Sequence, residues 1–239
     1  SPPVHSLKDL PTAGAPGLVI AAVPAREDAR DCLVSRDRAP LAGLRAGAVV
    51  GTSSPRRAAQ LRALRGDLRI EPVRGNVGTR VRKAREGALD AVVVAAAGIR
   101  RLGLESEVAE WLSLDVVLPA PGQGALAVQC RADDEATLAL AHAIDDPEAR
   151  AAAAAERAFL AALGSGCSAP VAAHAEPVSA RGRQVETLAL ELDGLVASLD
   201  GRRVVRVRGR GTDPRELGER LAKEALEKGA AAILSAIGG

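Results

Sequence analysis

The sequence of 239 residues has almost no aromatic side chains: Trp111 and Phe159 are its two aromatic residues, and Tyr and Met are absent. Proteins that bind single-stranded nucleic acid usually stack the bases on aromatic rings. The net charge is +2, from 32 Lys and Arg against 30 Asp and Glu, so no overall field attracts a nucleic acid or an anionic membrane. We therefore expect no nucleic-acid partner, cores built from Val, Leu, Ile and Ala, and basic sites that are local.

The chain also lacks an apolar run long enough to cross a bilayer. The stretch Ala88–Ile99 is interrupted by Asp90 and is far shorter than the roughly 20 residues that a membrane-spanning helix needs. Residues Ser1–Pro11 contain no continuous apolar core of the kind found in a secretory signal. We expect no transmembrane helix, no membrane partner and a cytoplasmic location.

Cysteine is scarce. Cys32, Cys130 and Cys167 are widely spaced, with no Cys-x-x-Cys pair and no nearby histidine at the spacing of zinc ligands. A disulfide framework and a structural metal site are therefore not expected.

The region from about residue 44 to 118 alternates short β-rich runs with amphipathic runs, which is typical of βαβ units and a parallel sheet. The pattern predicts three strands and two helices: strands over 48–52, 68–73 and 91–95, and helices over 55–64 and 77–85. This block is predicted to be an α/β domain.

The C-terminal block is predicted to be a small α+β domain. A helix begins near Pro147 and runs to Leu163, where Gly164 can end it. Strands are predicted over 186–192, 195–199 and 203–207, with a hairpin turn at Asp200-Gly201, and a last helix runs from Pro214 to about Gly229. The remaining segments, 1–29 and 119–131, contain strand-like runs at 18–23 and 125–129 and are interpreted as pieces of a third, incomplete domain.

Two segments combine a strand end, a helix start and arginines. In Gly51–Arg57 the helix begins beside Arg56 and Arg57, and its free N–H groups and dipole favour an anion. In Arg74–Arg80 a glycine-containing loop lies between two arginines. Because such turns meet at one edge of a parallel sheet, their charges are expected to converge on a carboxylate or phosphate ligand.

Ordinary structural explanations exist for the same residues. The first segment also fits a plain capped helix, with Ser54 as N-cap and Pro55 in its first turn. Four further arginines fit a solvated helix face, namely Arg62, Arg65, Arg82 and Arg85.

Two more positions are candidates for chemistry. Lys8 and Asp9 are adjacent in a segment that ends at Pro11, and a carboxylate near clustered arginines can stabilise a cationic intermediate and move protons, although Lys-Asp pairs are common on surfaces. Cys167, between Gly166 and Ser168, is expected in an accessible loop. The preceding helix end does not lower the pKa of its thiol, because the helix dipole is negative there. Three histidines, at positions 5, 142 and 174, are interpreted as structural or surface residues.

Taken together, these segments resemble the porphobilinogen deaminase (hydroxymethylbilane synthase) family over nearly the whole chain. Seven runs carry the resemblance in order: VHSLKDLP (Val4–Pro11), VGTSSPRRAAQL (Val50–Leu61), RGNVGTRV (Arg74–Val81), AAAGIRRLGL (Ala95–Leu104), LPAPGQGALAVQCR (Leu118–Arg131), AERAFL (Ala155–Leu160) and GSGCSAPV (Gly164–Val171).

The resemblance implies two α/β domains like those of periplasmic binding proteins and a small α+β domain that carries the cofactor cysteine. It implies that Cys167 holds dipyrromethane through a thioether, and that four porphobilinogen molecules are joined head to tail with loss of ammonia before hydroxymethylbilane is released. We assign residues 1–29 and 119–143 to a remnant of the first domain, 30–118 to the second and 144–239 to the third. A monomer is expected, whose partners are porphobilinogen and the growing polypyrrole.

The resemblance also implies roles for individual residues. Asp9 matches the catalytic aspartate, which stabilises positive charge on pyrrole nitrogens. Lys8 accompanies it, and further residues match positions that hold the carboxylates of cofactor and substrate: Thr52, Ser54, Arg56, Arg57, Arg74, Arg80 and Arg101. The family's early arginine-serine motif and glycine-rich loop are not found before Val4. The first domain is therefore expected to be incomplete and the activity weak, which leaves an inactive family member or a non-catalytic anion-binding module as alternatives.

Overall fold

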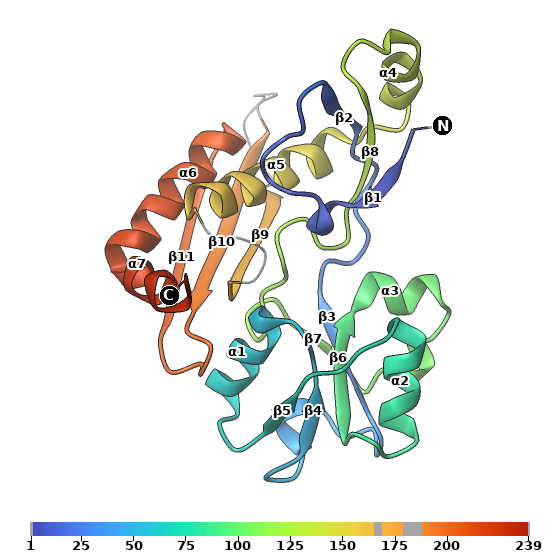
Figure 1. Ribbon diagram of the computed structural model, residues 1–239, viewed down its shortest axis with the longest axis vertical. Helices are drawn as coiled ribbons and strands as arrows, with labels where there is room; N and C mark the ends of the chain where they lie inside the picture. Colours follow the sequence, from blue (N-terminus) through green and yellow to red (C-terminus); the bar gives the residue numbers. More distant parts are fainter. Residues whose placement is uncertain (1, 165–168, 179–187, 239) are drawn as a thin grey trace.

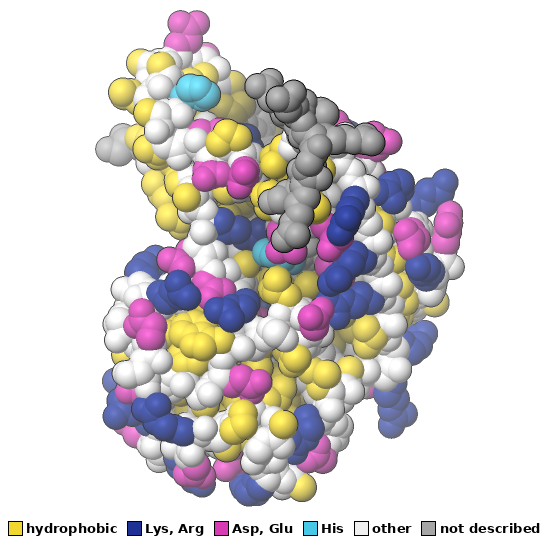
Figure 2. All heavy atoms as spheres, turned by 180° about the vertical axis from the view of Figure 1, so that it is seen from behind, with side chains coloured by type: hydrophobic (Ala, Val, Ile, Leu, Met, Phe, Trp, Pro, Cys, Tyr) yellow, Lys and Arg dark blue, Asp and Glu magenta, His cyan; other side chains and the backbone are white. Residues whose placement is uncertain are grey.

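The computed structural model describes residues 2–164, 169–178 and 188–238. Within these ranges the chain forms a mixed α/β fold with three separate sheets and helices packed against each of them (Figure 1). No helix in the described ranges is both long enough and apolar enough to span a membrane. The face shown in Figure 2 carries interspersed basic and acidic side chains, in keeping with the small net charge.

The first sheet joins the two segments that the sequence left outside its predicted blocks. Its strands, in spatial order, are β1 (Val4–Ser6), β8 (Leu126–Arg131) and β2 (Leu18–Ala22). The strand-like runs at 18–23 and 125–129 are confirmed as strands. Both outer strands pair antiparallel with β8, which makes the two runs neighbours. The 3-10 turn η1 (Leu7–Asp9) follows β1, and helix α4 (Glu135–His142) packs on β2 and β8.

The middle sheet has five strands. In spatial order they are β5 (Arg69–Glu71), β4 (Val49–Gly51), β6 (Ala91–Ala95), β3 (Asp31–Ser35) and β7 (Glu110–Leu112). Strands β5, β4 and β6 are parallel, as the sequence predicts, but β3 runs antiparallel to β6 and β7. The parallel sheet predicted for residues 44–118 is therefore confirmed for β5, β4 and β6. Strand β3 precedes that region and was not predicted. A short 3-10 turn, η2 (Leu41–Gly43), lies between β3 and β4.

The helices of this block follow the predicted strand ends. Helix α1 (Pro55–Leu64) and helix α2 (Val77–Arg85) have the predicted bounds. Both start at polar caps, because Ser54 Oγ accepts the Arg57 N–H (3.4 Å) and Asn76 Oδ1 accepts the Thr79 N–H (2.9 Å). A short helix that the sequence did not predict, α3 (Ala96–Arg101), follows β6 directly, and the turn η3 (Glu105–Glu107) comes next.

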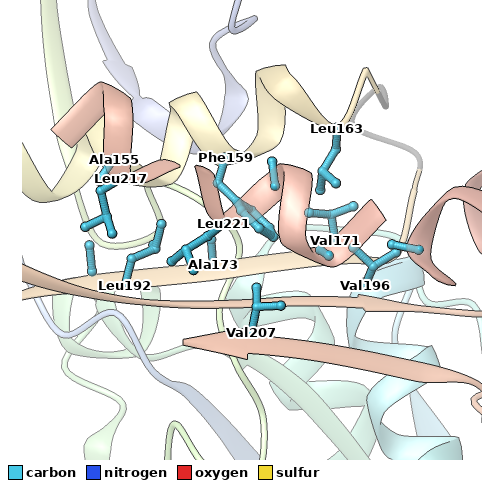
Figure 3. Close-up of a cluster of buried hydrophobic side chains, with 14 of the residues drawn as sticks. Ala155, Phe159, Leu163, Val171, Ala173, Leu192, Val196, Val207, Leu217 and Leu221 are labelled. Atoms are coloured by element: carbon cyan, nitrogen blue, oxygen red, sulfur yellow. The ribbon is translucent and has the colours of Figure 1, made fainter. Parts of the chain in front are cut away.

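The third sheet is antiparallel and is covered on one face by two helices. Its strands are β11 (Val204–Gly211), β10 (Ala189–Ala197) and β9 (Val171–Val178), and the helices are α5 (Pro147–Ala162) and α6 (Pro214–Ala225). Figure 3 shows Phe159 and Leu221 between the helices and the sheet, and both are fully buried. This core is the largest cluster of buried apolar side chains among the described residues.

One prediction for the third sheet is corrected. The two strands predicted over 186–192 and 195–199 are a single strand, β10, which runs without a break from Ala189 to Ala197. Residues 186 and 187 lie outside the described ranges. Gly194 does not break the strand. A Cβ there would lie 2.5 Å from the Phe159 ring, so glycine is needed to admit the aromatic side chain.

The last predicted helix ends near Gly229, as the sequence predicts. Helix α6 continues through η4 (Leu226–Ala230), in which Gly229 has a left-handed φ of 108° and interrupts the helix. A further helix that the sequence did not predict, α7 (Ala231–Gly238), follows this kink. The predicted turn at Asp200-Gly201 is confirmed, and the Gly201 N–H donates to the carbonyl of Ser198 (2.9 Å).

Candidate functional site

The Lys8-Asp9 pair lies in the turn η1, beneath the first sheet. Leu7 is 1% exposed within a core cluster, and its N–H donates to the carbonyl of Ala125 (3.0 Å). One backbone hydrogen bond closes the turn, from Leu10 N–H to the Leu7 carbonyl (3.2 Å). Because Leu7 is held inside, the turn presents Lys8 half-buried and Asp9 exposed.

Gly122 packs against this turn. It has φ of 74°, and a Cβ at this position would lie 3.1 Å from Leu7 Cγ and 3.2 Å from the Lys8 nitrogen. Both the left-handed backbone and the close approach favour glycine. The glycine-containing loop before β8 therefore forms the floor on which the Lys8-Asp9 turn rests.

A cavity of about 560 Å³ opens beside the turn. Four of the residues that line it are cationic: Lys8, Arg57, Arg80 and Arg101. No Asp or Glu occurs among the described residues that line it. Arginine and lysine side chains arranged in this way suit a ligand with several carboxylates.

The start of helix α2 adds to the positive character of the cavity. Asn76, Val77 and Gly78 line it at the first turn of the helix, where N–H groups have no partner within the helix and the dipole favours an anion. The Nε atom of Arg80 donates to the Gly75 carbonyl (2.8 Å), which holds its guanidinium at this wall. The sequence-based expectation that the two arginine-rich turns converge is confirmed for Arg57 and Arg80.

Two cationic groups in the cavity have lowered pKa values. Burial lowers the pKa of Lys8, and the nearby Arg57 charge lowers it further. Burial and Arg57 act in the same way on the pKa of Arg80. Burial is the larger cause of both shifts, and the Arg57 charge adds repulsion that a bound polyanion would relieve.

Behind the cavity, Arg56 and Arg57 share one buried carboxylate. Arg56 Nη1 lies 2.8 Å from Asp31 Oδ2, and Arg57 Nη2 lies 2.7 Å from Asp31 Oδ1. Gln123 Nε2 also donates to Asp31 Oδ1 (2.8 Å). Burial alone raises the pKa of Asp31, but the two guanidinium charges hold it well below its usual value. The Nε atoms of both arginines are buried without a partner among the described residues.

A second, smaller cavity of about 90 Å³ lies between the Lys8 turn, the start of α1, and helix α5 with strand β9. Lys8, Ser54 and Arg56 line it, and so does Ala169. Ala169 is two positions after Cys167 in the sequence. Cys167 itself lies outside the described residues.

Three of the predicted site residues that the structure describes line neither cavity. Asp9 is exposed in the turn beside them. Thr52 is buried, and its Oγ1 accepts the Ser54 N–H (3.1 Å). Arg74 is exposed on the loop before α2. The structure thus gathers Lys8 with the residues of α1, α2 and α3 that the sequence singled out, while Asp9, Thr52 and Arg74 lie outside the cavity walls.

Sequence reasoning missed Asp31 and Gln123, which hold the arginines of α1 from behind. Asp31 could have been noticed, because a charged residue before the apolar run Cys32–Val34 is unusual in a buried strand. Gln123 gave no such signal, since its partners lie far away in the sequence.

The other two cysteines are poorly placed for covalent chemistry. Cys32 is fully buried, and burial raises the pKa of its thiol to about 12. Cys130 is 6% exposed and lies in β8, with its Sγ near the Arg131 carbonyl (3.3 Å). A thiol that must react as thiolate is disfavoured at Cys32.

Comparison with known proteins identifies the family. Residues 3–139 match the family described as porphobilinogen deaminase, dipyromethane cofactor binding domain, and residues 151–227 match porphobilinogen deaminase, C-terminal domain. The porphobilinogen deaminase of Mycolicibacterium paratuberculosis is 53% identical over 97% of this chain and 75% of its own length. That of Roseiflexus castenholzii is 51% identical over 97% of this chain and 74% of its own length.

Among solved structures, a putative methionine-binding lipoprotein from Bacillus subtilis matches 55% of this chain and 62% of its own, with 16% identity and a TM-score of 0.39, too low to support any argument. The sequence matches decide the assignment: the chain belongs to the porphobilinogen deaminase family. It is accordingly a transferase of porphyrin and tetrapyrrole biosynthesis, with hydroxymethylbilane synthase function and a dipyrromethane cofactor.

The described residues fit such a cofactor. Dipyrromethane of this type carries acetate and propionate groups, and the larger cavity offers cationic side chains without a competing carboxylate. The buried, unpartnered Nε atoms of Arg56 and Arg57 add two N–H donors beside the cavities.

Proposed function

We propose that porphobilinogen units are joined at the Lys8-Asp9 turn, between the two cavities, with the cofactor attached at Cys167. One observation carries this proposal: Lys8 lines both the cationic cavity and the smaller cavity next to Ala169. A chain that is anchored near residue 167 and extends past Lys8 would have its carboxylates among the arginines. The burial of Cys32 and Cys130 supports Cys167 as the attachment point.

The arginines and Ser54 are proposed to bind different carboxylates of the cofactor and the substrate. Arg57, Arg80 and Arg101 bind those in the larger cavity, and Ser54 and Arg56 bind those in the smaller one. Charge-assisted bonds from arginine are short and directional, so they fix each pyrrole ring relative to the turn.

Besides Asp9, two residues outside the cavity walls, Thr52 and Arg74, are proposed to act from nearby. Thr52 orients Ser54 through the hydrogen bond to its N–H. Arg74 is exposed on the loop before α2, where it can contact incoming substrate.

The Lys8-Asp9 pair is proposed to perform the proton and charge chemistry. When bound, dipyrromethane supplies the pyrrole end to which the first porphobilinogen unit is joined. The exposed Asp9 carboxylate stabilises positive charge on the pyrrole nitrogen of the incoming unit as ammonia leaves. The lowered pKa of Lys8 allows its Nζ atom to give up a proton more readily than an ordinary lysine.

We further propose three domains: residues 1–29 with 119–143, residues 30–118 and residues 144–239. Each contains one of the three sheets, which supports this division. The first two are proposed to have the periplasmic-binding-protein type of fold. The protein is proposed to act as a cytoplasmic monomer.

The test of this function is turnover by the purified chain and by two variants. Asp9→Asn removes the proposed charge stabilisation and should lower kcat by about 100-fold or more, while Asp37→Asn, at an exposed surface position, should leave kcat unchanged. Equal turnover by Asp9→Asn and the unmodified chain would remove Asp9 from the reaction. No hydroxymethylbilane from the unmodified chain would favour an inactive family member or a non-catalytic anion-binding module.

A further inference from the structure

Helix α5 reaches the Lys8-Asp9 turn through the side chain of Arg157. Its Nη1 atom donates to the carbonyl of Leu10 (2.9 Å) and lies 3.5 Å from the carbonyl of Leu7, and its Nη2 atom donates to the carbonyl of Pro11 (2.6 Å). The Leu7 carbonyl comes directly before Lys8, and the carbonyls of Leu10 and Pro11 are one and two residues after Asp9. One guanidinium group, on helix α5, therefore binds the backbone at both ends of the turn.

The residue before it holds the floor of the same turn. Glu156 is fully buried, and its Oε2 accepts the Gly122 N–H (2.6 Å) while its Oε1 accepts the Ala175 N–H (2.8 Å) of β9. Gly122 is the glycine against which Leu7 and Lys8 pack. Two successive residues of α5 thus fix the turn and its support.

The turn has little internal reinforcement. Among the described residues, the bond from Leu10 N–H to the Leu7 carbonyl is its one internal backbone hydrogen bond, and Leu7 N–H is held by Ala125. A three-residue 3-10 turn with a single closing bond is weak by itself. The direction in which Lys8 and Asp9 point therefore depends on contacts from outside.

We propose that Arg157 is a positioning residue for the Lys8-Asp9 pair. The inference rests on the proposed role of Asp9. Helix α5 ends at Ala162, five residues before Cys167, so the same helix that leads to the proposed attachment point also sets the turn. A displacement of about 1 Å at a catalytic group can cost as much as 100-fold in rate, which is why such a contact matters.

The chain offers a matched control on the same helix. Arg150 donates to the carbonyls of Ile20 (3.3 Å) and Ala21 (2.8 Å) in β2 and pairs with Asp145. Like Arg157, Arg150 connects α5 to backbone carbonyls in residues 1–29. None of these bonds involves the Lys8-Asp9 turn, so Arg150→Met removes a similar link at a different place.

The first test is hydrogen exchange by mass spectrometry on Arg157→Met and Arg150→Met. Arg157→Met should speed exchange in a peptide spanning residues 7–10 by about tenfold and leave β2 unchanged. Arg150→Met should have the opposite pattern. Equal protection of residues 7–10 in Arg157→Met and the unmodified chain overturns the proposal, and this readout needs no turnover.

The second test is steady-state kinetics with Asp9→Asn measured in parallel. Arg157→Met should lower kcat about tenfold with KM changed less than about threefold, Arg157→Lys should recover part of the loss, and Arg150→Met should keep kcat. If Asp9→Asn abolishes turnover and Arg157→Met does not lower it, the positioning role is wrong. If Asp9→Asn retains turnover, the proposed function of Asp9 fails instead.

Discussion

The Nη1 atom of Arg56 lies 2.8 Å from Oδ2 of Asp31, with 5% and 0% of the two side chains exposed. The pair links the start of α1 to the start of β3, and Arg57 bonds the second oxygen of the same carboxylate. A binding site for carboxylates is therefore built on arginines that a buried carboxylate already orients. The arrangement keeps two like charges adjacent in the absence of a ligand.

Replacing Asp31 with Asn should lower the free energy of unfolding by about 3–5 kcal/mol, because two buried guanidinium groups lose their counter-charge. Asp67, which is exposed and pairs with Arg65, provides the control: Asp67→Asn should cost far less than Asp31→Asn, because water screens its charge. Urea denaturation of the two variants gives both numbers. Similar small losses in both would show that Asp31 does not carry the network.

Replacing Gly122 with Ala should disturb both stability and turnover. The left-handed backbone alone costs about 1–2 kcal/mol for a residue with a Cβ, and the new atom would press on Leu7 and Lys8. Gly17 has a similar φ of 76°, but a Cβ added there would point into open space. Both alanine variants should therefore lose stability in thermal unfolding, while kcat falls only in Gly122→Ala; an equal kcat in the two would contradict the packing of the turn on Gly122.

Acid should lower the free energy of unfolding because of the largely buried side chain of His174. Burial lowers its folded pKa, the charge of Arg26 lowers it too, and Glu156, with Oε1 3.6 Å from Nδ1, acts in the opposite direction. With the folded pKa below the unfolded value of about 6.5, the unfolded chain takes up the proton first. Stability is thus lost as pH falls through and below about 6.5, until the folded pKa is reached.

The measurement is the free energy of unfolding of His174→Gln and of the unmodified chain between pH 8 and pH 5. The unmodified chain should lose stability relative to His174→Gln on acidification, by at most about 1.4 kcal/mol per pH unit. His142→Gln, at an exposed position in α4, serves as the control and should follow the unmodified chain. Parallel curves for all three proteins would show that His174 does not titrate differently in the folded state.

Local signals predicted the parts of the fold that depend on local chemistry. The start of α1 was predicted from its cap, Ser54, and from Pro55, and α2 from the alternation of β-rich and amphipathic runs. The cap of α2, Asn76, became evident only in the structure. Strand β3 was not predicted, and its direction could not be predicted in this way, because pairing direction depends on which strand it meets in space. The continuous β10 also required tertiary information, since the partner that occupies the space at Gly194 is Phe159.

In the candidate site, too, the residues with local sequence signals were predicted and the long-range contacts were not. Lys8, Arg57 and Arg80 were predicted from short motifs, and the structure brings them to one cavity. The contacts that orient them, from Asp31 and from Arg157, join residues far apart in the sequence. No local pattern encodes such pairs, so they were found only once the chain was folded.

The central claim, that the cofactor is attached at Cys167 beside the Lys8-Asp9 turn, is tested most directly by the intact mass of the purified chain, expressed with porphobilinogen available, together with peptide mapping. The account predicts a mass increase of one two-pyrrole unit, found on the peptide that contains Cys167 and lost in Cys167→Ala. An unmodified Cys167, or the same adduct on Cys32 or Cys130, would contradict it.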